Sequence, residues 1–112
     1  MIVSKADTAL AQGSGDMEVL ATPRMVAVME NAAMRVAAAE CAEGETTVGT
    51  LINVAHTRAT PLCDEVRAEA TLVSREGRKL SFEVVAYDTK GEIGRGTHER
   101  FIVSREKFLS RL

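Results

Sequence analysis

Two hydrophobic patterns divide this chain. Between residue 22 and about residue 39, alanine, valine and methionine occupy most positions, and few charges interrupt them. The run opens with Thr22-Pro23, a capping residue followed by a proline suited to the first turn of a helix, and Glu43-Gly44-Glu45 closes it. Because apolar residues lie on nearly every face, the pattern predicts one long helix that a sheet or a partner encloses.

The hydrophobic period changes to two from residue 46 onward. Valine, alanine and leucine alternate with polar residues between positions 65 and 72, which predicts a half-buried strand. Glycine-containing turns at 76–78 and 89–91 lead to strands near 79–88 and 92–103, and Ser104 is placed to cap a last short helix. These three strands predict an antiparallel meander. The whole pattern predicts an α+β domain in which one buried helix precedes about four long strands.

Length and composition indicate a single domain over residues 1–112. With 46% hydrophobic side chains the chain can form its own core, but that core is thin for a monomer, which favours oligomerisation. Residues 1–16 form a mixed stretch that ends in Gln12-Gly13-Ser14-Gly15-Asp16. We interpret this stretch as an edge strand followed by a mobile loop.

Charge and cysteine content argue against several classes of partner. Fourteen basic and 16 acidic residues give a net charge of -2 without any basic run, so nucleic acid is not an expected partner. The longest apolar stretch, residues 25–41, is too short and too polar to span a membrane. Cys41 and Cys63 lack a CxxC pattern, which favours a cytoplasmic protein with inert thiols, unless a histidine lies close to one of them.

Three residues are candidates for acid-base chemistry: Thr22, Glu30 and His56. On a helix, apolar residues at positions 26, 33 and 37 share the face of Glu30 and would partly bury it, and His56 follows apolar residues at even spacing on a strand. Each has a purely structural alternative. Thr22 could only cap the helix, Glu30 could pair with an arginine such as Arg24 or Arg58, and His56 could be a core histidine with its hydrogen bonds satisfied.

The spacing of this triplet constrains its geometry. In a regular helix, Thr22 and Glu30 lie ~12 Å apart along the axis, so their side chains cannot touch. Either the first helical turn is irregular, or two subunits bring the helix start of one chain beside Glu30 of the other. We expect the second arrangement, which is a site at a two-fold interface.

A second group lies on the last predicted strand. Gly94 and Gly96 would let a ligand or another backbone approach closely, although a bulge explains them about as well. His98 and Arg100 share the strand parity of these glycines. Arg100 could bind an anion or pair with an acid across the sheet.

Three strings, VLATPRMVAVMENA, GTLINVAHTRATP and EIGRGTHERFIV, resemble the fluoroacetyl-CoA thioesterase-like family of hotdog-fold proteins over roughly residues 17–108. The resemblance implies a long central helix wrapped by an antiparallel β-sheet, a homodimer, hydrolysis of acyl-CoA thioesters, and no metal or redox cofactor. It also implies that Thr22, Glu30 and His56 are the catalytic set and that Gly49 and Arg100 lie in the substrate pocket.

The implied enzyme cleaves a short or medium acyl-CoA with water. His56 would act as general base, Glu30 would orient the water or attack the carbonyl, and Thr22 would hydrogen-bond the reacting centre. Two other functions fit the same fold: an acyl-CoA-binding module without turnover, and an enoyl-CoA hydratase. Where members specialised for fluoroacetate carry a lid phenylalanine, this chain reads Gly15-Asp16-Met17-Glu18, so a broader acyl range is expected.

Overall fold

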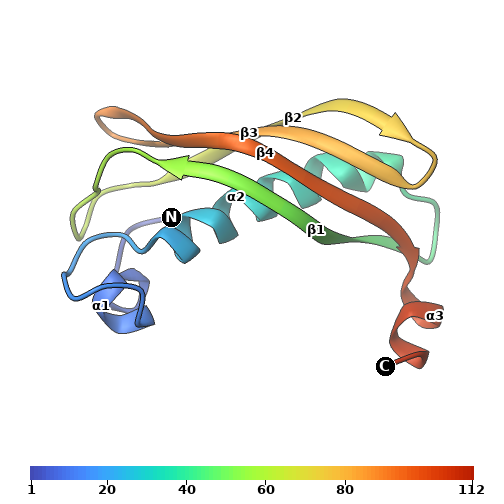
Figure 1. The fold of residues 1–112 in the computed structure, drawn as a ribbon, viewed down its shortest axis with the longest axis horizontal. Helices are drawn as coiled ribbons and strands as arrows, with labels where there is room; N and C mark the ends of the chain where they lie inside the picture. Colours follow the sequence, from blue (N-terminus) through green and yellow to red (C-terminus); the bar gives the residue numbers. More distant parts are fainter.

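The computed structural model describes all 112 residues and contains one long helix against one sheet (Figure 1). The main elements are α2 (Thr22–Ala37), β1 (Glu45–His56), β2 (Arg67–Glu76), β3 (Lys79–Asp88) and β4 (Gly91–Ser104). The strands are antiparallel in the order β1-β4-β3-β2. This arrangement confirms the predicted α+β class.

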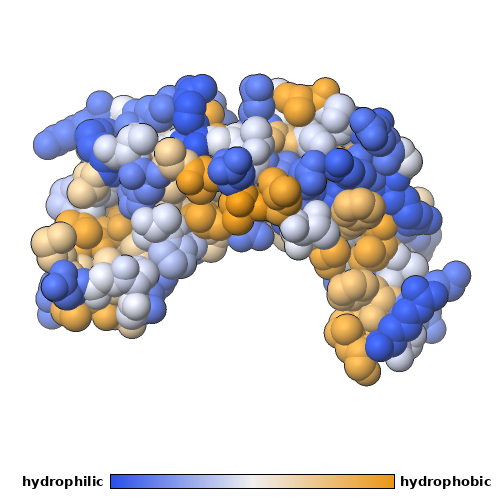
Figure 2. Space-filling model, viewed as in Figure 1, coloured by the Kyte–Doolittle hydropathy of each residue, from blue (hydrophilic) through white to orange (hydrophobic).

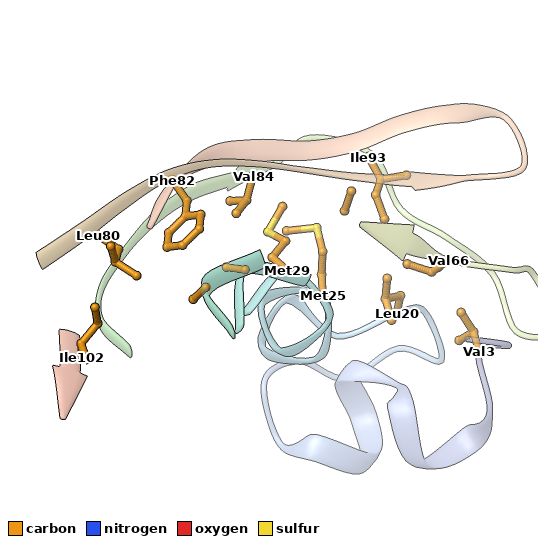
Figure 3. Close-up of a cluster of buried hydrophobic side chains, with 13 residues drawn as sticks. Val3, Leu20, Met25, Met29, Val66, Leu80, Phe82, Val84, Ile93 and Ile102 are labelled. Atoms are coloured by element: carbon orange, nitrogen blue, oxygen red, sulfur yellow. The ribbon is translucent and has the colours of Figure 1, made fainter. Parts of the chain in front are cut away.

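The helix α2 packs on the sheet through one stripe of residues. Met25, Met29, Ala33 and Ala37 are fully buried. Figure 3 shows Met25 and Met29 under the sheet, in the same cluster as Phe82 of β3. Burying one large apolar side chain contributes about 1.5–3 kcal/mol, so this stripe holds the helix to the sheet. The helix ends two residues earlier than predicted and continues as a 3-10 turn, η2 (Ala38–Glu40).

The sheet contains the predicted three-strand meander and, beside it, the strand β1, whose position the sequence did not predict. β2, β3 and β4 follow one another through turns at Gly77 and Gly91, whose positive φ values of 62° and 129° favour glycine. β1 lies beside β4 at an edge of the sheet, with a bulge between Gly49 and Leu51. The Ser104 side chain accepts a hydrogen bond from the Lys107 amide at the start of α3 (Arg105–Ser110), which confirms the predicted cap.

The N-terminal segment contains more structure than the sequence indicated. Ile2 forms an isolated bridge with Glu65, and two short helices follow, η1 (Lys5–Asp7) and α1 (Ala9–Gln12). Thr8 caps α1 by accepting a hydrogen bond from the Ala11 amide. Helices of a single turn show no hydrophobic periodicity, and for that reason the pattern did not reveal them.

The molecule is arched. Its Cα radius of gyration is 15.2 Å, whereas a compact domain of this length has about 13 Å. Figure 2 shows a hollow between the α1 end and the α3 end, with hydrophobic residues over the middle of β1. Leu51 and Ile52 of β1 are 45% and 39% exposed. The chain alone therefore leaves an apolar strand edge uncovered.

Candidate active site

The first candidate group joins the start of α2 to the end of β1. Thr22 Oγ1 lies 2.8 Å from Nδ1 of His56. Ala21, rather than Thr22, occupies the N-cap position, and no side chain caps this helix. The structural alternative for Thr22 is therefore wrong. Its hydroxyl is free to contact His56 because Thr22 is already the first helical residue.

His56 is half-buried and incompletely hydrogen-bonded. Its Nε2 atom is buried and has no partner, so it is not a satisfied core histidine. Desolvation lowers the pKa of His56 below its usual value. A lowered pKa keeps the imidazole neutral at physiological pH, and a neutral imidazole can accept a proton.

A cavity of ≈320 Å³ lies beside the Thr22–His56 pair. Gly15, Asp16 and Met17 line its other side. This is the segment in which specialised relatives were expected to carry a lid aromatic residue. Here the lining residues of this segment are a glycine, an acidic residue and a methionine.

The second candidate group contains Glu30, Gly49 and Arg100. Arg100 Nη1 lies 4.0 Å from Glu30 Oε2, and the Arg100 side chain is only 8% exposed while that of Glu30 is 41% exposed. Desolvation lowers the pKa of Arg100, and the Glu30 carboxylate opposes this shift. The Arg100 partner is therefore an acid on the helix and not, as one alternative had it, an acid across the sheet.

Glycine at position 49 leaves room for the side chains of Glu30, His98 and Arg100 to lie against β1. A Cβ there would lie 3.0 Å from Glu30 Oε2, 3.2 Å from His98 Cε1 and 3.3 Å from Arg100 Nη1. Each distance is tighter than ordinary van der Waals contact. Gly49 also pairs with Arg100 in the β1–β4 register. The two residues assigned together from the family resemblance thus lie together beside Glu30.

Glu30 does pair with an arginine, as its structural alternative held, but the partner is Arg100 and not Arg24 or Arg58. Arg24 pairs with Asp7 at 2.9 Å, and Arg58 pairs with Asp88 at 2.6 Å. Sequence proximity and charge were the only signals for those pairings, and neither encodes the sheet register that brings Arg100 to the helix.

The two groups lie apart within one chain. Residues 49 and 56 are roughly 20 Å apart along the extended strand. The helix is regular from Thr22 to Ala37, so an irregular first turn does not shorten the ~12 Å between Thr22 and Glu30. Glu30 therefore does not reach the Thr22–His56 pair of its own chain.

The strand glycines serve packing. A Cβ at Gly94 would lie 2.6 Å from the Ala55 carbonyl oxygen and 2.8 Å from Met25 Sδ. A register shift of the β3–β4 pairing also lies beside this glycine: Ala86 pairs with Gly94 and Tyr87 pairs with Glu92, so Ile93 is an extra residue on β4. Both alternatives therefore apply at this glycine, since another backbone approaches it closely and a bulge adjoins it.

The Cys41 thiol is not activated as a nucleophile. Burial raises the pKa of the Cys41 thiol, which disfavours the reactive thiolate.

No group of three or more His, Cys, Asp or Glu side chains is arranged to hold a metal ion. None of the helices has the length and apolar character needed to cross a membrane.

Sequence reasoning missed Thr47 and gave His98 no role. Both contact the Arg100 guanidinium: Nε donates to Thr47 Oγ1 at 2.8 Å, and Nη1 lies 3.2 Å from His98 Nε2. The even spacing of His98 and Arg100 on one strand was the available signal.

The long helix packed on a four-stranded antiparallel sheet, with a Thr–His pair at the helix start, defines a protein of the hotdog fold. A hot-dog-like protein from Thermanaerovibrio acidaminovorans has the same architecture, with a TM-score of 0.87 and 25% identity over 99% of this chain and 82% of that one. Residues 3–106 match the family described as fluoroacetyl-CoA-specific thioesterase FlK, and the chain belongs to that family.

Individual relatives agree with this assignment. The fluoroacetyl-CoA thioesterase of Streptantibioticus cattleyicolor is 50% identical over 91 residues, which cover 81% of this chain and 66% of that protein. A structure of fluoroacetyl-CoA thioesterase FlK superimposes with a TM-score of 0.91 and 40% identity over 99% of this chain and 87% of that one. Variants of FlK have been solved with acetyl-CoA and with fluoroacetate and CoA.

Proposed function

We propose that this protein hydrolyses short acyl-CoA thioesters to the free acid and CoA, as a single domain over residues 1–112. The observation that carries the proposal is the 2.8 Å contact between Thr22 and His56, with a buried and unpartnered Nε2. A histidine that is oriented through one ring nitrogen and keeps the other unpartnered can act as general base on a water that enters the site with the substrate. Membership in a family of thioesterases supports the same chemistry.

The reaction follows from the hydrogen-bond roles of the pair. Neutral His56 donates Nδ1–H to Thr22 Oγ1, which leaves Nε2 free to take a proton from water. The water oxygen then adds to the thioester carbonyl carbon, and Thr22 Oγ1–H hydrogen-bonds the reacting centre. The tetrahedral intermediate expels the CoA sulfur, which recovers the proton, and the carboxylic acid is released. The Thr22 backbone amide has no acceptor inside the helix and is available to the oxyanion.

We further propose that Glu30 acts on this centre from a second copy of the chain, where it orients the water or attacks the carbonyl. The separation of the two groups within one chain supports this arrangement. The free edge of β1, the apolar residues exposed on it and the arched shape all support a homodimer.

The register of β1 supports a specific pairing. Suppose that the β1 strands of two subunits pair antiparallel about a two-fold axis at Asn53. The bulge after Gly49 adds one extra residue to the strand. His56 of one subunit then lies opposite Gly49 of the partner subunit. Both residues face the helix side, because their β4 partners, Gly94 and Arg100, lie an even number of residues apart. Glu30 beside Gly49 would then face the His56 of the other chain.

The acyl range follows from the cavity. Asp16 and Met17 line the cavity in the segment where specialised relatives carry a lid phenylalanine. A rigid aromatic side chain there would exclude water and contact a very small acyl group closely. We therefore propose a wider choice of short or medium acyl-CoA substrates than fluoroacetyl-CoA alone. A cytoplasmic location, expected from the two free cysteines, suits a CoA ester.

The decisive experiment is thiol release from a panel of acyl-CoAs by the purified protein. We expect Glu30→Ala and His56→Ala each to lower kcat/KM by at least ~100-fold, because positioned acid-base groups contribute that much. Thr22→Ala should cost less. Circular dichroism must first show that each variant is folded. If folded His56→Ala releases thiol at the wild-type rate, the assignment of His56 as the general base is wrong. Binding of esters without turnover would identify a binding module, and a hydrated product with CoA still attached would identify a hydratase.

A further inference from the structure

A buried histidine holds the arginine of the second group. His98 is 1% exposed, lies on β4 two residues before Arg100, and packs beside the Phe82 ring at a centroid distance of 6.2 Å. Its Nδ1 atom lies 2.7 Å from the Leu51 carbonyl oxygen, and its Nε2 atom lies 3.2 Å from Arg100 Nη1. Neither ring nitrogen is left without a partner.

These two contacts determine the tautomer. A carbonyl oxygen only accepts hydrogen bonds, so Nδ1 of His98 must carry the proton that is donated to Leu51. Arg100 only donates, so Nε2 must carry a lone pair. His98 is therefore neutral, with the proton on Nδ1, and its two ring nitrogens have different tasks.

Each of the three nitrogens of the Arg100 guanidinium has one hydrogen-bond partner. Nε donates to Thr47 Oγ1 at 2.8 Å and Nη2 donates to the Thr47 carbonyl at 3.0 Å, while Nη1 donates to His98. The second hydrogen of Nη1 remains for Glu30, whose Oε2 atom lies 4.0 Å away. Because guanidinium is planar, holding three of its nitrogens also determines the direction of this remaining hydrogen.

We propose that His98 is a positioning residue, which directs Arg100 Nη1 at the Glu30 carboxylate and so sets the position from which Glu30 acts. This inference rests on the proposed function, in which Glu30 serves the thioester site. His98 touches neither substrate nor reacting atoms. An apolar residue of the same volume would fill the space but would leave a buried cation one acceptor short.

Two substitutions separate the tasks of the ring nitrogens. The amide nitrogen of Asn at position 98 takes the place of Nδ1 and can still donate to the Leu51 carbonyl, but no acceptor faces Arg100. The amide oxygen of Gln can take the place of Nε2 and accept from Arg100, while the bond to Leu51 is lost. Each variant loses one hydrogen bond of the pair, so they are matched for the cost in stability.

The experiment compares His98→Asn and His98→Gln by kinetics and by NMR of the arginine Nε–H groups, with the Arg100 signal identified by its loss in Arg100→Lys. We expect His98→Asn to lower kcat by about 10-fold or more with KM little changed, because Glu30 acts in the transition state. We expect His98→Gln to stay within about 3-fold of wild-type kcat. The Arg100 signal should persist in His98→Gln and broaden or exchange in His98→Asn.

Other outcomes overturn the proposal. Equal kcat losses in both folded variants, in step with their melting temperatures, would mean that His98 only stabilises the fold. Full kcat in His98→Asn would mean that Arg100 needs no such acceptor. If the wild-type protein hydrolyses no ester, the proposed function fails, and the NMR comparison alone decides the role of His98: an Arg100 signal unchanged in His98→Asn refutes it.

Discussion

A site divided between two chains predicts complementation between inactive variants. In a heterodimer of a Glu30→Ala chain and a His56→Ala chain, one site combines the intact His56 of the first chain with the intact Glu30 of the second. The other site lacks both groups. One of two sites is therefore intact, and the heterodimer should show about half of wild-type kcat per dimer, whereas each parent homodimer is reduced by at least ~100-fold.

The assay uses two affinity tags. The two chains are co-expressed with different tags, the heterodimer is isolated by sequential purification, and thiol release from acetyl-CoA is followed. A heterodimer of Thr22→Ala and His56→Ala is the matched control, because both substitutions fall on the same half of the site. That heterodimer regains no intact site, so its activity should not exceed the average of its parents.

Either of two results would refute this reasoning. A folded Glu30→Ala/His56→Ala heterodimer as inactive as its parents would mean that each site is built within one chain. Full activity of a monomer at micromolar concentration, detected by light scattering, would exclude a shared site as well. In both cases the ~12 Å between Thr22 and Glu30 would have to be closed by a helix rearrangement.

Three further outcomes are expected. The protein should be a dimer by light scattering, and Val54→Pro, which removes an amide that points away from β4 beside the centre of the proposed β1 pairing, should yield monomer with little activity; an active dimer would contradict the pairing. Since burial lowers the pKa of His56, kcat/KM should stay level as pH falls to about 6.5 and decline only below it, and loss of activity already above that value would contradict the base assignment. Because the pKa of His56 is lower in the folded state, the unfolded state binds the imidazole proton first as pH falls. The contribution of His56 to the free energy of unfolding should therefore become unfavourable as pH falls through about 6.5. The pH dependence of unfolding of the wild type and of His56→Ala measures this contribution. Finally, kcat/KM for fluoroacetyl-CoA should be close to that for acetyl-CoA; a ratio above ~1000 would mean that Met17 or its neighbours rebuild a selective pocket.

Much of the fold was predictable because its determinants are local. The apolar run and the proline at position 23 predicted the long helix, alternation predicted β2, and glycines at positions 77 and 91 predicted the turns, where φ is positive. Ser104 was correctly predicted as a cap, since capping depends on only three or four following residues. The spacing of Thr22 and Glu30 predicted that their side chains could not touch in a regular helix, and α2 is continuous from Thr22 to Ala37.

Tertiary structure alone decided which groups meet across long sequence separations. The pairing of β1 with β4 brings Gly49 to Arg100 and turns that arginine toward Glu30 on the helix, where charge and proximity suggested other partners. The Thr22 hydroxyl contacts His56 and does not cap its own helix, because the end of β1 packs at the helix start. Such contacts depend on sheet register and helix packing, which sum many weak interactions over the whole chain, whereas the helix, the turns and the caps depend on a few neighbouring residues.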